Sequence, residues 1–236
     1  MSEQIPFILP YTTSYQAEAF VRGKANAAAL DWLSGWPDWP APYRMLNIFG
    51  PSGSGKTHLS HVFELTSNAV RLTKLRDIIQ FEETRARHFI FDDVDHENAF
   101  CPEAMFHFFN YLASENGTAL LLSTMPAGRM DIQMKDLKSR LRAIAAQEIY
   151  APDDDLLKAV LQKMFEDRQI IVTDMIIDLM LRSMERNFTF AYHLVAQIDR
   201  RALASKKPVT LPLVRQVIEN EMNKKSCENS NIGKDE

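Results

Sequence analysis

Eight residues, from Gly50 to Thr57, have the types and the spacing that phosphate binding requires. They read Gly-Pro-Ser-Gly-Ser-Gly-Lys-Thr and match the pattern G-x-x-x-x-G-K-[ST] at every fixed position. Such a loop turns successive backbone N–H groups toward an anion and leads into a helix N-terminus, where the helix dipole adds positive potential. Three of the eight glycines in the chain lie in these eight residues, which argues against a chance surface turn.

The side chains of this loop have distinct expected tasks. Lys56 is expected to reach the β- and γ-phosphates of a nucleotide, and the Thr57 hydroxyl to hold Mg²⁺. The alternative is a surface turn rich in Gly and Ser, but an apolar run precedes the loop and a helix-like stretch follows it. We therefore expect nucleotide contacts from Gly50, Gly53, Ser54, Gly55, Lys56, Thr57 and His58.

A pair of acids, Asp92 and Asp93, follows the apolar run from His88 to Phe91. A short continuous apolar run is typical of a buried parallel strand, and ligands of open α/β sheets bind outside the carboxyl ends of strands. This is the Walker B pattern of P-loop proteins, with Asp92 as the Mg²⁺ carboxylate and Asp93 as the base that orients the attacking water. We interpret Asp95, two residues further on, as part of a solvated turn.

A second buried strand is predicted from Thr118 to Thr124. Its last two residues, Ser123 and Thr124, are hydroxyl side chains at the carboxyl end. They are candidates for sensing the γ-phosphate or its attacking water, and a hydroxyl that simply caps the strand end is the alternative.

The composition describes an ordinary globular chain, with 46% hydrophobic and 25% charged residues among 236. A net charge of −4 provides no long basic surface for nucleic acid. Cys101 and Cys227 have no metal-ligand spacing and indicate a reducing compartment. The first residues are not basic, and no apolar run approaches the roughly 20 residues of a membrane span. We therefore expect a cytoplasmic protein without membrane contact.

The C-terminal third changes character after Tyr150, because helical periodicity replaces the strand patterns. The sequence therefore predicts an α/β class with a parallel sheet, followed by a small all-helical domain, which is the organisation of AAA+ proteins. The expected boundaries are an N-terminal segment at 1–18, an αβα nucleotide-binding domain at 19–151, a helical lid at 152–222 and a polar, disordered tail at 223–236.

Three motifs together resemble the DnaA branch of AAA+ proteins, and more narrowly the Hda-type regulators. The segment 20–26, Phe-Val-Arg-Gly-Lys-Ala-Asn, is similar to the family's adenine-enclosing segment, and 55–59 repeats its G-K-T-H-L. The stretch 136–141 is similar to the family's box VII. The resemblance implies adenine contacts from Phe20, Val21 and Asn26, and a role for Arg140 as arginine finger. The alternative for Arg140 is a surface ion pair with Asp136, four residues earlier.

The N-terminal segment contains the apolar stretch Gln4 to Leu9, which its prolines exclude from a helix interior. From the residues alone, an edge strand and an extended docking peptide are equally good interpretations. The resemblance favours docking, since the stretch is similar to the peptides by which Hda proteins attach to the sliding DNA clamp. The implied clamp-binding residues are Gln4, Ile5, Phe7 and Leu9.

The implied function is a clamp-associated regulator that holds ADP or ATP with Mg²⁺ and presents Arg140 to ATP bound by DnaA, thereby repressing replication initiation. No helix-turn-helix follows the lid, so direct sequence-specific DNA binding is not expected. Thr189 stands where the family's lid carries a sensor arginine, and Arg186 lies three positions earlier. The absence of an arginine at position 189 predicts weak intrinsic ATPase activity. A helicase-loader-like switch and a self-sufficient ATPase are the alternatives. The sequence leaves the working nucleotide and the oligomeric state, including homo-oligomers, open.

Overall fold

The structure, a computed structural model, describes residues 21–75 and 85–232, with side chains as far as Asn223. Contacts within the chain divide it into two compact units, one ending at Ala151 and the other beginning at Pro152. Five residues with predicted roles lie outside the described residues, so those roles stay predictions: Gln4, Ile5, Phe7, Leu9 and Phe20.

The first unit is built on a five-stranded parallel sheet with strand order β2-β3-β4-β1-β5. The central strands are the apolar runs, because a strand covered on both faces has no solvent side for polar residues. The strands are β1 Met45–Phe49, β2 Val70–Leu72, β3 His88–Phe91, β4 Thr118–Ser123 and β5 Ala145–Glu148.

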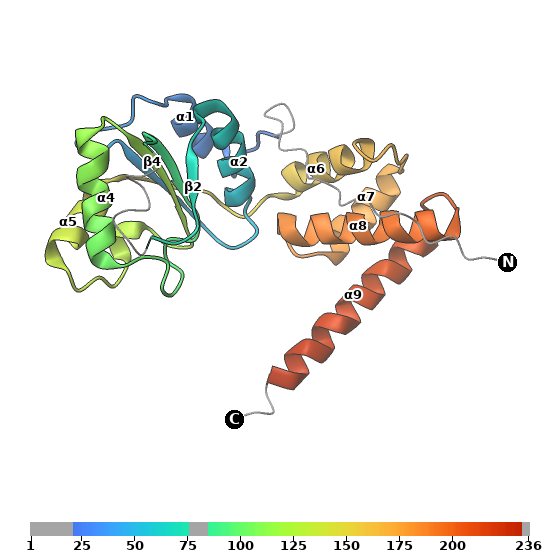
Figure 1. Ribbon diagram of the computed structural model, residues 1–236. Coiled ribbons are helices and arrows are strands. Elements are labelled where there is room, and N and C mark those ends of the chain that lie inside the picture. The colour runs from blue at the N-terminus through green and yellow to red at the C-terminus, as the bar shows by residue number, and fades with distance from the viewer. Residues whose placement is uncertain (1–20, 76–84, 233–236) are drawn as a thin grey trace. The chain divides into compact units, whose positions relative to one another are not determined.

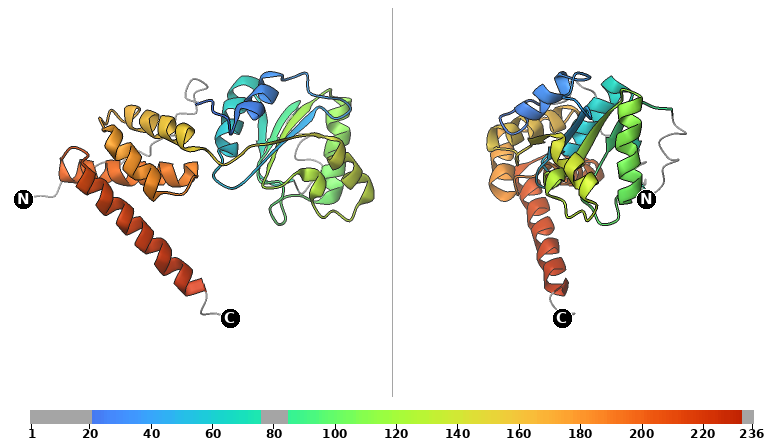
Figure 2. Two further views of the ribbon diagram at one scale, coloured as in Figure 1. Left: turned by 180° about the vertical axis from the view of Figure 1, so that it is seen from behind. Right: turned by 90° about the vertical axis from the view of Figure 1, so that its left-hand side faces the viewer.

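Helices cover both faces of this sheet (Figures 1 and 2). α1 Ala27–Ser34 and α2 Lys56–Ser67 pack on the face that Leu46, Ile48 and Ile90 supply. The helices α4 Pro102–Ser114 and α5 Lys135–Ala143, with the short 3₁₀ turn η2 Ala127–Arg129, belong to the core of the other face. The alternation of strand side chains therefore separates α5 from α2 by the thickness of the sheet.

The aromatic loop after α1 adds to the core beside β1. Trp39 is buried and stacks on Phe63 of α2, with ring centroids 5.4 Å apart. Its indole N–H donates to the Trp32 carbonyl at 2.9 Å. This loop therefore caps the core beside β1.

The second unit consists of four helices, α6 Asp154–Glu166, α7 Asp174–Ser183, α8 Phe188–Ser205 and α9 Leu211–Ile232. Its core contains only its own residues, among them Leu161, Leu194 and Val217. Two helices begin at side-chain caps, since Asp153 accepts from Leu156 N and Asn187 from Phe190 N. The predicted class, an α/β sheet domain followed by a helical region, is confirmed.

The backbone of α9 continues to Ile232, where the sequence analysis expected a disordered tail from residue 223. The helix thus extends into the range predicted as a tail. The polar composition suggested disorder, but no Pro or Gly interrupts the chain between Pro212 and Gly233. Among the described residues, no helix is long and apolar enough to cross a membrane.

Candidate nucleotide-binding site

The phosphate loop runs from the end of β1 to the first turn of α2. Gly53 and Gly55 have φ of 75° and 97°, in the left-handed region that a side chain rarely adopts. At Gly50 a Cβ would lie 2.0 Å from the Ile149 carbonyl oxygen, so no larger residue fits there. The glycines that the motif requires are therefore needed by the geometry of this loop.

Lys56, at the start of α2, is buried and points back across the loop. Its Nζ donates to the carbonyls of Gly50 at 2.8 Å and Pro51 at 3.0 Å. Burial lowers the pKa of Lys56, against the opposing charges of Asp93, Asp95 and Asp92. The ammonium is thus held in the loop among acids at the sheet edge, where a nucleotide phosphate would add a further counter-charge.

The loop fits a phosphate group in one further respect. The Ser54 hydroxyl is buried, and among the described residues it has no hydrogen-bond partner. Such an orphan is costly in a folded protein unless a ligand supplies the missing partner. His58, partly buried in the next turn, has its pKa lowered by burial and by the neighbouring His61.

The two predicted Mg²⁺ ligands lie together. The Thr57 side chain hydrogen-bonds the Asp92 carboxylate, which also accepts from the backbone N–H of Asp93. Burial and the adjacent Asp93 raise the pKa of Asp92, although Arg71 and these hydrogen bonds oppose the rise. A buried carboxylate that resists ionisation gains from a cation, so the pair fits a divalent metal ion held partly by phosphate.

Asp93 is exposed and has a positive φ of 51°. A left-handed residue two positions after the end of β3 turns the chain, and the side chains of Asp92 and Asp93 then lie in different surroundings, one partly buried and one in solvent. This exposure leaves Asp93 accessible to a water molecule, which its predicted role as base requires.

Both strand-end hydroxyls form hydrogen bonds within the protein. Ser123 is fully buried and donates to the Met125 carbonyl at 2.6 Å. Thr124 donates both its backbone N–H, at 2.6 Å, and its hydroxyl to the Asp95 carboxylate. Asp95 therefore lies in a partly exposed turn, as the sequence predicts, and its carboxylate also caps Thr124 and links the turn after β3 to the end of β4. The sequence could not reveal this pair, because 29 positions separate its members.

Asn47 is a buried polar residue that the sequence analysis treated as part of an apolar run. Its Nδ2 donates to Ser123 Oγ at 2.8 Å and to the Leu121 carbonyl at 3.2 Å. Its Oδ1 accepts from Ala127 N at 2.8 Å. It fixes β1, β4 and the turn after β4 to one another behind the loop, and the signal was a lone amide in an otherwise apolar strand.

The segment expected to enclose adenine is folded on itself. Asn26 is buried, accepts from Gly23 N at 2.8 Å and donates to the Val21 carbonyl at 3.0 Å. The N–H of Tyr150 donates to the Ala25 carbonyl at 3.1 Å, which links the segment to the residues after β5. The Asn26 amide therefore fixes the shape of this loop.

Arg140 extends from α5 onto α4, and the expected alternative pair with Asp136 is not formed. Its guanidinium lies 4.0 Å from the ring centroid of Phe106 and donates to Asn110 Oδ1 at 2.7 Å. No ion pair of Arg140 occurs between residues whose side chains the structure describes. The guanidinium is thus ordered by an aromatic ring and an amide without being neutralised.

The lid residues near the expected sensor position are already folded into their own unit. Thr189 is exposed in the first turn of α8. Arg186 donates through Nε and Nη2 to the two carboxylate oxygens of Asp154, both at 2.9 Å. This exposed bidentate pair holds the Arg186 side chain at the start of α6.

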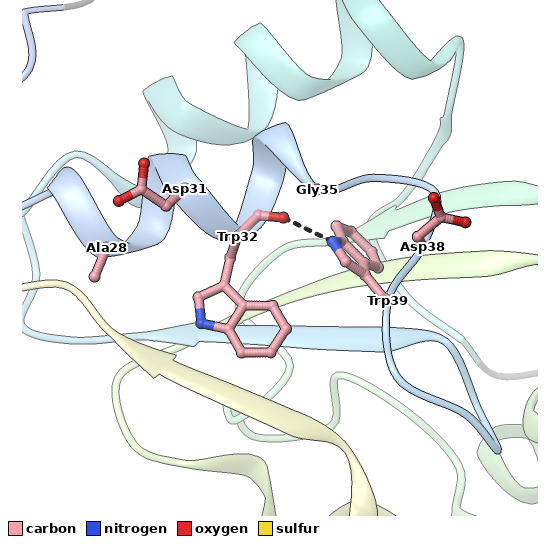
Figure 3. A pocket seen from close by; sticks show the side chains of 6 residues that line it. All are labelled: Ala28, Asp31, Trp32, Gly35, Asp38 and Trp39. Atoms are coloured by element: carbon pink, nitrogen blue, oxygen red, sulfur yellow. Dashed lines mark hydrogen bonds between the residues drawn. The ribbon is translucent and has the colours of Figure 1, made fainter.

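A hollow of about 360 Å³ lies against α1 and the loop that follows it, with the Trp32 and Trp39 rings in its wall (Figure 3). None of the residues predicted to contact nucleotide lines it, and we place the nucleotide site at the loop on its backbone geometry and charges. The lining residues are Ala28, Asp31, Trp32, Gly35, Asp38 and Trp39.

Comparisons with known proteins agree with this fold. Residues 153–218 match the family model described as Hda, lid domain. The chromosomal replication initiator protein DnaA of Flavobacterium psychrophilum is 25% identical over 252 residues, which span 91% of this chain and 52% of that protein. The chain spans about half the length of the curated DnaA relatives it matches.

Solved structures share the fold. Domain III of Thermotoga maritima DnaA superposes with a TM-score of 0.72 at 18% identity, covering 90% of this chain and 98% of that domain. AMPPCP-bound DnaA from Aquifex aeolicus has a TM-score of 0.63 at 19% identity, covering 81% of this chain and 65% of that one.

The chain has the fold of an AAA+ protein. Its parallel sheet carries a phosphate loop after β1 and acids after β3, and a helical unit follows the sheet. Within that class the matches to DnaA and to the Hda lid agree with the motifs of the sequence. The chain is similar to DnaA over most of its length, and residues 153–218 of its helical unit match the lid domain of the Hda model.

Proposed function

We propose that this protein is a nucleotide-binding regulator that stimulates the hydrolysis of ATP bound to DnaA and so represses the initiation of chromosomal replication. The observation that carries the proposal is the environment of Arg140. Its guanidinium is held on α4, on the sheet face opposite α2, and it has no carboxylate partner among the side chains that the structure describes. A cation placed away from the chain's own phosphate loop is suited to a nucleotide on a neighbouring molecule.

The chain's own nucleotide, ADP or ATP, is proposed to lie on the phosphate loop. The backbone of the loop and Lys56 hold the phosphates, and the free Ser54 hydroxyl donates to one of them. Thr57 and Asp92 would hold Mg²⁺, which neutralises phosphate charge when bound. Asp93 orients a water molecule. Ser123 supports the loop from behind, and Thr124 is held by Asp95.

Hydrolysis of this nucleotide in cis is proposed to be slow. The lid offers Thr189 at the position of the sensor arginine, and a hydroxyl cannot supply the charge-assisted contact of a guanidinium. The bidentate pair with Asp154 supports this proposal, because it engages the nearest arginine, Arg186, within the lid. The nucleotide then acts as a stable structural ligand.

The proposed action on DnaA uses Arg140 as a finger. An arginine inserted beside the γ-phosphate stabilises charge in the transition state, and such fingers are worth on the order of 10³–10⁵ in rate. The Asn110 and Phe106 contacts keep the guanidinium extended along α4, which lowers the entropy lost when it enters a partner's site. The proposed place of action is the sliding clamp in the cytoplasm, reached through Gln4, Ile5, Phe7 and Leu9.

The test is single-turnover hydrolysis of ATP preloaded on DnaA, with clamp loaded on DNA and the regulator in excess. Arg140→Ala is expected to reduce stimulation by on the order of 10³-fold while retaining ADP binding. Arg140→Lys should recover little, because a point charge cannot replace the planar fork. Arg142→Ala removes an exposed arginine two positions along the same helix and is the matched control. Full stimulation by Arg140→Ala would exclude the finger mechanism.

A further inference from the structure

The side chain of Arg71 enters the proposed metal site from β2, the edge strand beside β3. In the parallel register Arg71 lies opposite Ile90, two residues before Asp92. Its Nη1 donates to Asp92 Oδ2 at 3.4 Å, and only 20% of each of the two side chains is exposed. The guanidinium is therefore a positive charge built into the protein beside the carboxylate expected to bind Mg²⁺.

Contacts with α2 hold this guanidinium in place. Nη2 donates to Glu64 Oε2 at 2.9 Å and to Ser60 Oγ at 3.0 Å, and it lies 3.3 Å from His61 Nδ1. Burial raises the pKa of Glu64, but hydrogen bonds and charge from Arg71 and His61 outweigh that effect and lower it. Two carboxylates thus share one guanidinium, and the Asp92 carboxylate keeps part of its charge for another cation.

The geometry is not that of a saturated ion pair. The contact with Asp92 is long compared with the contact to Glu64, and the buried Arg71 Nε has no partner among the described residues. If Arg71 served only to hold β2 and β3 against α2, its guanidinium would be expected to form a bidentate ion pair with one carboxylate. Arg71 instead divides its nitrogens between α2 and the metal-side carboxylate.

We propose that Arg71 is a positioning residue that partly replaces the divalent metal ion, so that nucleotide binding at this site depends only weakly on Mg²⁺. The inference rests on the proposed function, since it takes the phosphate loop and Asp92 as the nucleotide and metal site. Without metal, Arg71 offsets the repulsion between the Asp92 carboxylate and the nucleotide phosphates. With metal, the two cations face the same carboxylate and repel one another.

The experiment measures the ADP dissociation constant of the full chain by calorimetry, in Mg²⁺ and in EDTA. The dissociation constant in EDTA divided by that in Mg²⁺ measures how strongly ADP binding depends on the metal. Arg71→Gln is expected to weaken metal-free binding more than binding in Mg²⁺, and so to raise the ratio about tenfold. Arg71→Lys retains the positive charge, so its ratio of dissociation constants should lie closer to that of the unsubstituted protein. Arg87→Gln removes an exposed arginine just before β3 and is the matched control.

A double-variant cycle separates this role from a structural one. If Arg71 acts through Asp92, the Arg71→Gln substitution should leave the ratio unchanged when Asp92→Asn is already present. A structural clamp would lower the melting temperature in both backgrounds without moving the ratio. An unchanged ratio in Arg71→Gln overturns the inference and leaves nucleotide binding standing. Absence of ADP binding by the unsubstituted chain would instead overturn the proposed function.

Discussion

Opposing interactions act on the pKa of the Asp92 carboxyl group. Burial and the adjacent Asp93 disfavour its ionised form, while Arg71, the Thr57 hydroxyl and the Asp93 N–H favour it. The net effect is a raised pKa, so burial and Asp93 outweigh the interactions that favour the ionised form. Before ligand binds, the ionised carboxylate therefore costs folding free energy, and a cation at the site would recover that cost.

This balance predicts that Asp92→Asn stabilises the nucleotide-free protein at neutral pH. A raised pKa in the folded state means that stability falls as pH rises through the carboxyl range, since ionisation is harder in the folded chain. The neutral amide avoids that loss, and we expect a melting temperature higher by about 2 °C at pH 7. The advantage should vanish in acid, where Asp92 is protonated.

The measurement is thermal unfolding in EDTA across a pH series. Asp93→Asn, at the exposed neighbour, is the comparison that removes one charge without removing the buried carboxylate. If Asp92→Asn melts lower than the original protein at every pH, the contacts with Arg71 and Thr57 contribute more than the charge costs. The balance described for this residue would then be wrong.

At the scale of elements, the phosphate loop depends on how closely β1 and the end of β5 approach. Gly50 N donates to Ser123 O at 3.1 Å, and Ile149 N to Phe49 O at 2.8 Å. These bonds bring the Ile149 carbonyl against Gly50. The phosphate loop is consequently anchored on both neighbouring strands, β4 and β5, before α2 begins.

Gly50→Ala should therefore be strongly unfavourable. Its Cβ would lie 2.0 Å from a backbone oxygen, so β1 or the end of β5 must shift, and we expect a loss of about 1–3 kcal/mol in unfolding free energy. Gly35→Ala is the matched control, because Gly35 has a φ of −78° and the nearest atom is 3.5 Å from its Cβ position. Urea unfolding measures both. Equal stability of the two variants would contradict the anchoring of the loop.

At the scale of the whole molecule, each unit has its own core. Among the described residues, the core that contains Leu161, Leu194 and Val217 is formed by side chains of the helical unit alone. A unit that is stabilised by its own apolar contacts does not need the remainder of the chain to fold.

We therefore expect residues 152–232 to fold as an isolated helical domain. The expected result is a cooperative thermal transition followed by far-ultraviolet circular dichroism. Leu194→Asp, which places a charge in the centre of that core, should abolish the transition. A gradual, non-cooperative loss of helix in the unsubstituted segment would show that the helical unit requires the sheet unit.

The sequence by itself determined the class of the fold and the position of the phosphate loop. The motif from Gly50 to Thr57 is contiguous, and β3 and β4 are continuous apolar runs, so local chemistry was sufficient for them. The strands β2 and β5 could not be predicted, because they lack such a local apolar pattern. β2 and β5 contain Arg71 and Gln147, and they become strands only because a neighbour offers a ladder to complete.

Only the tertiary structure decided which side chains meet around the loop. Asp95 with Thr124, Asn47 with Ala127, Arg71 with Asp92 and Arg140 with Asn110 are contacts across 21 to 80 positions of sequence. No local pattern encodes such pairs, because each depends on the strand order and on which face of the sheet a helix covers. The tertiary contacts also added information on single residues: Asp95 caps Thr124 as well as lying in a turn, and Arg140 contacts Phe106 and Asn110 in place of the alternative ion pair with Asp136.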